Sequence, residues 1–168
     1  MQYKDYQDYF EDLATAHKAI QHTEAKKRFC DVDPEEIIKG LRTGIDYKNY
    51  CLILESFDVR GADRYSDNPR GIYSGAFWVI KHCKASDYTM KKTILNESLD
   101  IVYAILARIK KEKEIIPKQA TIPHFVDVNS FSINKIGPVG DNCYGWRTEF
   151  NFNNSLSQAL KYNQSDWL

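Results

Sequence analysis

The chain has 168 residues, of which 43% are hydrophobic and 13% are aromatic. This composition is sufficient for a packed core and excludes a disordered chain. Its 23 basic and 23 acidic residues cancel, so we do not expect a protein that binds nucleic acid through a net basic surface. No stretch approaches the roughly 18 consecutive apolar residues of a membrane-spanning helix. We expect one domain over 1–168, with a peripheral segment at about 155–168.

The first two expected elements are helices. Apolar or aromatic side chains recur three or four residues apart, which predicts a helix over 3–23; they are Tyr6, Phe10, Leu13, His17 and Ile20. A second, shorter helix is expected between Asp33 and Gly44. Asp33 suits the N-cap position, and Pro34 suits the first helical position.

Two extended segments and a long helix follow. Residues 50–59 and 72–83 are apolar with mixed alternation, which predicts two strands. The turn-forming, charged stretch between them makes an antiparallel hairpin with a long tip. A helix is expected over 88–113, with Asp87 as N-cap. Its apolar stripe is Leu95, Leu99, Val102, Leu106 and Ile109, widened by Ile94, Ile101 and Ile105. We expect Leu99, Val102 and Leu106 to be buried beside Trp146 and Phe150.

The last part of the chain predicts a second hairpin. Residues 124–136 change face along the strand, which requires a bulge near 129–130. Along the final strand the aromatic residues share one face: Tyr144, Trp146, Phe150 and Phe152. This face is either one wall of the core or a platform on which a ligand stacks. We favour the core wall, because a stacking platform needs surrounding basic residues. A short C-terminal helix or a frayed end follows, with Trp167 expected to dock on another surface.

These elements predict an α+β fold. An antiparallel β-sheet of two hairpins is covered on one face by the long helix and the N-terminal helix.

The sequence offers few patterns of catalytic or metal-binding chemistry. His17 and His22 are five residues apart, which does not match a zinc-binding helix, and His82 and Cys83 are adjacent on a strand. The acidic stretch 31–36 is explained by helix capping. The four cysteines form no CxxC pair, and the first ten residues do not form a secretory signal, so we expect free thiols in the cytosol. We expect no catalytic residue, metal or cofactor.

The hairpin tip is the most informative loop. Arg60, Arg64 and Arg70 lie there among aspartates, in "RGADRYSDNPRG". These arginines could bind a phosphate or pair with a charged partner surface, although a charged hairpin tip can also be solvated surface. Loops of about a dozen residues are more often functional than short ones. We predict that the three arginines form a partner interface.

The order of elements resembles that of the tail terminator and tail-completion proteins of long-tailed phages and related contractile tails. The segments that carry the resemblance are "PEEIIKGLRTG" before "YCLILES", the charged break "DVRGADRYSDNPRG", "GAFWVIKHCKASDYT" before the long helix, and "FSINKIGPVGDNCYGWRTEFNF". The resemblance implies a structural protein with no catalytic residues. It would form a homo-oligomeric ring, for example a hexamer, on the tail tube or on connector proteins.

Two classes of function remain open at this point. The first is this virion protein, made in the cytoplasm of the bacterial host by a phage or prophage and then located in the virion tail. The second is a small cytosolic α+β enzyme or ligand-binding domain. The absence of recognisable catalytic patterns favours the first.

Overall fold

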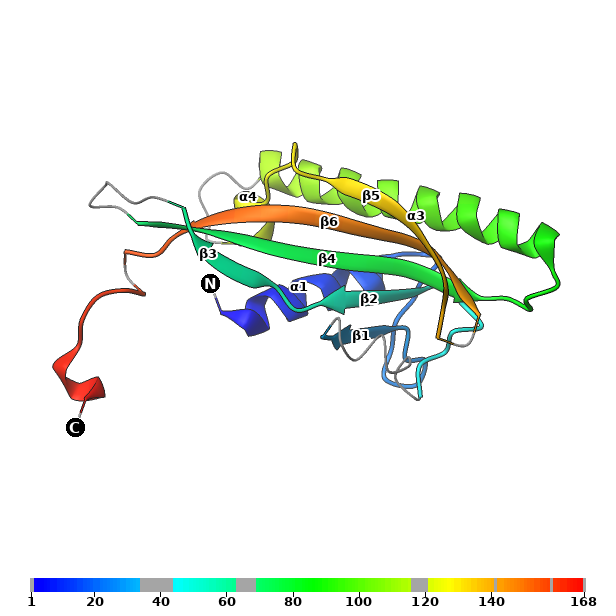
Figure 1. The fold of residues 1–168 in the computed structure, drawn as a ribbon, viewed down its shortest axis with the longest axis horizontal. Helices are drawn as coiled ribbons and strands as arrows, with labels where there is room; N and C mark the ends of the chain where they lie inside the picture. Colours follow the sequence, from blue (N-terminus) through cyan, green and yellow to red (C-terminus); the bar gives the residue numbers. More distant parts are fainter. Residues whose placement is uncertain are drawn as a thin grey trace.

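The structure, a computed structural model, describes residues 2–33, 44–62, 69–115, 121–140, 142–157 and 159–167. The helices are α1 (Tyr3–Ala16), α3 (Tyr88–Ile115), α4 (Ile122–Phe125) and a 3-10 turn, η1 (Gln164–Asp166). The strands are β1 (Phe29–Val32), β2 (Cys51–Glu55), β3 (Asp58–Gly61), β4 (Arg70–His82), β5 (Ser132–Val139) and β6 (Cys143–Ser155). They form one sheet beside the two main helices (Figure 1). The predicted α+β class is confirmed.

The sheet has the order β1-β2-β4-β6-β5, and β3 pairs with β4 beyond the end of β2. Every pair is antiparallel except β1 and β2, which run parallel, so the sheet is mixed. The sequence reading missed β1, because a strand of four residues is too short to show alternation. A parallel neighbour also needs a long return connection in place of a tight turn.

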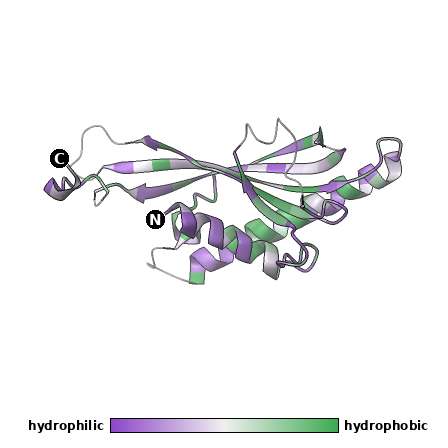
Figure 2. Cartoon of the chain, turned by 90° about the horizontal axis from the view of Figure 1, so that it is seen from below, coloured by the Kyte–Doolittle hydropathy of each residue, from purple (hydrophilic) through white to green (hydrophobic). Residues whose placement is uncertain are grey.

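Both main helices pack on the same face of the sheet (Figure 2), as predicted. Phe10 of α1 stacks on Phe150 of β6 with ring centroids 5.5 Å apart, and Tyr6 stacks on Phe152 at 5.7 Å. Tyr144, Phe150 and Phe152 are buried and Trp146 is half-buried. The aromatic face of the last strand is therefore a core wall, which confirms the favoured interpretation.

Helix α1 ends at Ala16, so the prediction that it continues to residue 23 was wrong. His17 has an extended backbone, and Gln21 has a φ of 53°, in the left-handed region. This reversal turns the chain back towards the sheet and buries Ile20 and His22 outside the helix. The helical spacing of apolar residues continues to Ile20, but Ile20 lies in the turn after α1 and is buried from there.

Helix α3 confirms the long helix, but the apolar stripe is rotated from its predicted position. Its buried residues are Ile94, Ser98, Ile101, Val102, Ile105 and Ile109. Leu99 and Leu106 are only half-buried, so the expectation that they are core residues was wrong. Two adjacent rows of the helix are apolar, and spacing alone does not decide which row faces the sheet. Trp146 still reaches α3, where its Nε1 donates to the carbonyl of Leu95 at 2.7 Å.

The predicted strand at 124–136 begins later than expected. Residues Ile122–Phe125 form α4, and Val126 makes only an isolated bridge to Phe152. Asp127 then holds a turn, accepting from the N–H of Asn129 at its side chain and from the N–H of Ser130 at its carbonyl, each at 3.0 Å. The change of face expected near 129–130 is therefore made by a turn and not by a bulge. The helix predicted between Asp33 and Gly44 falls mostly on residues 34–43, outside the described residues.

Candidate partner interface

Strands β3, β4 and β6 extend past the helices at one end of the sheet (Figure 1). We call this end the arm and define it as β3 with residues 70–74 of β4 and 151–155 of β6. Pairing of β4 with β6 continues without interruption to Arg70 and Ser155, which makes the arm a regular part of the sheet. All four residues of β3 are exposed, with Val59 at 50%. The arm is therefore an open, partly apolar sheet edge at the end of the molecule.

The structure places two of the three predicted interface arginines on the arm. Arg60 lies on β3 opposite Ile72, and Arg70 is the first residue of β4, opposite Ser155. Both are exposed. Arg64 lies outside the described residues. The hairpin register thus brings Arg60 and Arg70 onto neighbouring strands, close enough to act on one partner surface.

A cavity of about 460 Å³ lies where the end of the arm meets α3 and α4. Arg70 lines it together with Lys113 from the end of α3 and His124 from α4, and Asp127 contributes the acidic side chain. The Lys113 ammonium donates to the carbonyl of Val126, which fixes the end of α3 to the segment after α4. The polar lining and basic side chains suit a carboxylate or another anionic group of a partner.

Sequence reasoning missed Lys113 and His124 as neighbours of Arg70. The lysines near the end of α3 were explained by the helix dipole. Lys113 is 43 residues from Arg70 along the chain, and His124 is 54 residues from it, as their numbers give. Spacing carries no signal for such a contact, because the packing of α3 and α4 against the sheet creates it.

A buried ion pair lies on the sheet face opposite the helices, where β2 ends and the arm begins. Glu55 is only 4% exposed. Its carboxylate accepts two hydrogen bonds from one edge of the Arg147 guanidinium, from Nε at 2.5 Å and from Nη2 at 2.8 Å, and a third from Trp78 Nε1. The pKa of Arg147 is raised, first by the hydrogen bond to Glu55, against burial that lowers it. These bonds leave the Glu55 carboxylate fully engaged, so its role is structural.

His22 and the cysteines have structural surroundings in the part of the chain described. His22 is buried, and its Nδ1 accepts the backbone N–H groups of Arg28 and Phe29 at 3.0 and 3.1 Å. All four cysteines are buried, and none is in a disulfide. Burial raises the pKa of Cys51 and of Cys83, which disfavours the reactive thiolate. Among the described residues, no group of three or more His, Cys, Asp or Glu side chains is arranged to hold a metal ion.

Comparison with known proteins assigns no family, because no family model, no curated protein and no solved structure matches the chain. None of the helices within the described ranges is both long and apolar enough to cross a membrane. Function is therefore inferred from the arm, its charges and the chemistry of the side chains around it.

Proposed function

We propose that the protein is a structural tail protein of a phage or prophage, similar to a tail terminator or tail-completion protein. It would form or join a ring at the tail end or at the head–tail joint, and so pass from the host cytoplasm to the virion tail. The observation that carries the proposal is the exposed arm with Arg60 and Arg70, which suits contact with another protein.

The arm has the properties of a controlled docking edge. Within the described residues β3 pairs only with β4, so its other edge presents backbone N–H and C=O groups to a partner. Asp58 and Arg60 place charges on this short strand, which discourages indiscriminate strand addition. A partner with complementary charges overcomes that penalty, because arginine binds carboxylates in a directional, bidentate way.

A contact of this kind is heterologous, since the arm of one subunit meets a different surface on its neighbour or on the tube. Heterologous contacts close into a ring when the rotation between subunits permits it. We expect oligomers that depend on concentration or on a tube end as template. Free subunits can then remain monomeric until a tube is present.

One observation favours the alternative of a cytosolic ligand-binding domain or enzyme. The cavity beside Arg70, at about 460 Å³, falls within the range of about 300–1,000 Å³ typical of small-molecule sites. Its lining of Arg70, Lys113 and His124 would suit a small anionic ligand. Such a ligand would bind to the monomer and would not require the β3 edge.

The test reverses the charge of the arm. We expect the triple variant Arg60→Glu, Arg64→Glu, Arg70→Glu to lose assembly on purified tail tubes and to leave tails incomplete. Its melting temperature should stay within about one or two degrees of the wild type, since exposed charges contribute little to folding. The matched control reverses three exposed lysines away from the arm, Lys48, Lys84 and Lys92, and should assemble normally.

Two results would count against the proposal. A triple variant that completes tails as well as the wild type would show that the arm is only solvated surface. A wild type that stays monomeric with purified tubes would contradict the terminator function itself, and binding of small anions beside Arg70 would then favour the alternative.

A further inference from the structure

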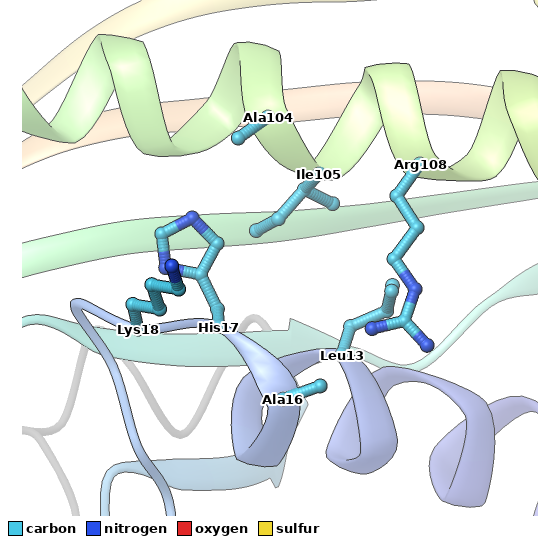
Figure 3. Close-up of a pocket in the computed structure, with 7 residues that line it drawn as sticks. All are labelled: Leu13, Ala16, His17, Lys18, Ala104, Ile105 and Arg108. Atoms are coloured by element: carbon cyan, nitrogen blue, oxygen red, sulfur yellow. The ribbon is translucent and has the colours of Figure 1, made fainter.

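A second surface, distant from the arm, lies between α1 and α3. It is a groove of about 330 Å³ (Figure 3). Leu13 and Ile105 form its apolar floor and are each 2% exposed. Ala16 and Ala104 stand on opposite walls, and their small side chains leave the space above the buried floor unfilled. The groove therefore has room for one large apolar side chain.

The rim of the groove is basic. His17 and Lys18 lie at one end, and Arg108 lies at the other (Figure 3). Arg108 is anchored by its Nε, which donates to Glu112 Oε1 at 2.7 Å. Arg108 lines the groove together with Leu13, so a planar cation is part of its border. A floor of this kind with a cationic border favours an aromatic ring, which combines apolar area with attraction to a cation.

The C-terminal segment carries aromatic side chains that are exposed to solvent. Residues 156–157 and 159–167 lie beyond the sheet at the arm end, away from the body (Figure 1). Leu160, Tyr162 and Trp167 are between 66% and 68% exposed. The rings of Tyr162 and Trp167 stack on each other, with centroids 6.5 Å apart. Large apolar side chains clustered on an exposed segment mark a contact surface, and tryptophan and tyrosine are the usual anchors of such contacts.

We infer that the α1–α3 groove of one copy of this chain binds the Tyr162–Trp167 end of a second copy. The indole ring of Trp167 would lie between Ala16 and Ala104, above the buried floor, with Lys18 and Arg108 at the two ends of the groove. The two surfaces are complementary in kind, because one offers an apolar floor with a cationic border and the other offers exposed aromatic rings.

The position of the C-terminal segment favours binding to the groove of a second copy over binding to the groove of the same chain. The segment leaves the body at the end of the long axis where the arm lies, whereas the groove lies at the middle of α3 (Figure 1). A contact between copies uses two different surfaces, so it can repeat from one subunit to the next. The inference rests on the proposed function in one respect, because it assumes a ring of subunits. In that ring the groove and the C-terminal segment would form the contact between subunits, and the arm would contact the tail tube.

The experiment uses two variants, one that removes the aromatic anchor of the C-terminal segment and one that blocks the groove. Trp167→Ala removes the inserted ring, and Ala104→Trp fills the groove from an exposed position. A fluorescein-labelled peptide of residues 156–168 is titrated against full-length Trp167→Ala protein and followed by anisotropy. We expect saturable binding that weakens about tenfold or more when Ala104→Trp is added to the receptor.

Sedimentation of the two single variants then tests the contact between whole chains. Each variant alone should associate about tenfold or more weakly than the wild type. An equimolar mixture should form a dimer and stop there, because only one intact groove and one intact segment remain per pair. Tyr88→Ala, at a residue 71% exposed, and Ala107→Trp, at an exposed position outside the groove, serve as matched controls and should associate as the wild type does.

The inference is overturned if the peptide does not bind, or if Ala104→Trp leaves its affinity unchanged. It is also overturned if the mixture forms no dimer, which would indicate binding within one chain. Failure of the tail function is a separate result. If Trp167→Ala completes tails as well as the wild type does, only this contact between copies is refuted. If the 156–168 peptide binds but the wild-type protein does not assemble on tubes, only the tail function is refuted.

Discussion

The two faces of the sheet are stabilised in different ways. The helix-covered face is an aromatic and aliphatic core in which α1, α3, β4 and β6 meet, with Phe10 and Phe150 in direct ring contact. The opposite face has a smaller apolar cluster, formed by Cys30, Val32, Cys51, Ile53, Trp78, Ile80 and Cys143. Beside this cluster lies the Glu55–Arg147 ion pair, where the sheet continues as the arm.

This difference shows how one sheet can combine a stable body with an exposed end. Apolar burial stabilises in proportion to the area removed from water and tolerates some variation in geometry. An ion pair at a protein boundary must recover the cost of desolvation, which it does only in good hydrogen-bonding geometry. Glu55 and Arg147 meet this condition through two direct bonds and the added bond from Trp78. The pair, together with Trp78, therefore links β2, β4 and β6 where β2 ends and the arm begins.

The largest effect is expected on the helix-covered face. Phe10→Ala should lower the free energy of unfolding by about 3–5 kcal/mol, because the ring is fully buried and its loss leaves a cavity among other rings. Urea denaturation followed by circular dichroism measures the change. Val59→Ala on the exposed arm is the control and should cost less than about 0.5 kcal/mol. A comparable loss in both variants would mean that the aromatic layer is not the main core.

A smaller but clear effect is expected at the ion pair. Arg147→Ala should cost about 3 kcal/mol, since it leaves the buried Glu55 carboxylate without its partner. The double variant Arg147→Met, Glu55→Gln should recover part of this loss, because no unpaired charge remains. Both are measured by the same urea denaturation. If the double variant is as unstable as Arg147→Ala, packing of the side chain and not charge explains the effect.

The smallest effect is a pH dependence at the edge of the helical layer. Burial lowers the pKa of His17 below its ordinary value of 6.5, and its Nδ1 accepts the N–H of Ala19 at 3.2 Å in the neutral state. The unfolded chain then takes up the proton first on acidification. The stability from neutral His17 is complete above about pH 6.5 and is lost as the pH falls through the lowered value.

The variant His17→Asn tests this pH dependence, because its amide oxygen can replace Nδ1 as acceptor without taking up a proton. Between pH 7 and pH 5 the wild type should lose more stability than the variant. The difference is measured by thermal unfolding at several pH values. Parallel losses in the two proteins would assign the acid sensitivity to other groups.

Sequence patterns predicted the elements that are long and regular. Helix α3, strand β4 and strand β6 each span at least 13 residues, so periodicity of apolar residues had room to appear. The aromatic wall was also predictable, because alternation fixes which side chains share a face of a strand. Short elements were missed for the same reason, as β1 and α4 have only four residues each.

The candidate sites were predictable only in part. Arg60 and Arg70 were identified because they lie in one charged stretch of the sequence. Their neighbours Lys113 and His124, and the groove between α1 and α3, come from segments that local spacing does not connect.

The sequence by itself determined the α+β class, the main strands and the helix-covered face, because these follow from local periodicity and from the need to bury apolar stripes. Only the tertiary structure decided which row of α3 faces the sheet, where α1 ends, and that Glu55 pairs with Arg147 across 92 positions. These features depend on how elements distant in the sequence pack together. Local patterns restrict such packing but do not select one arrangement.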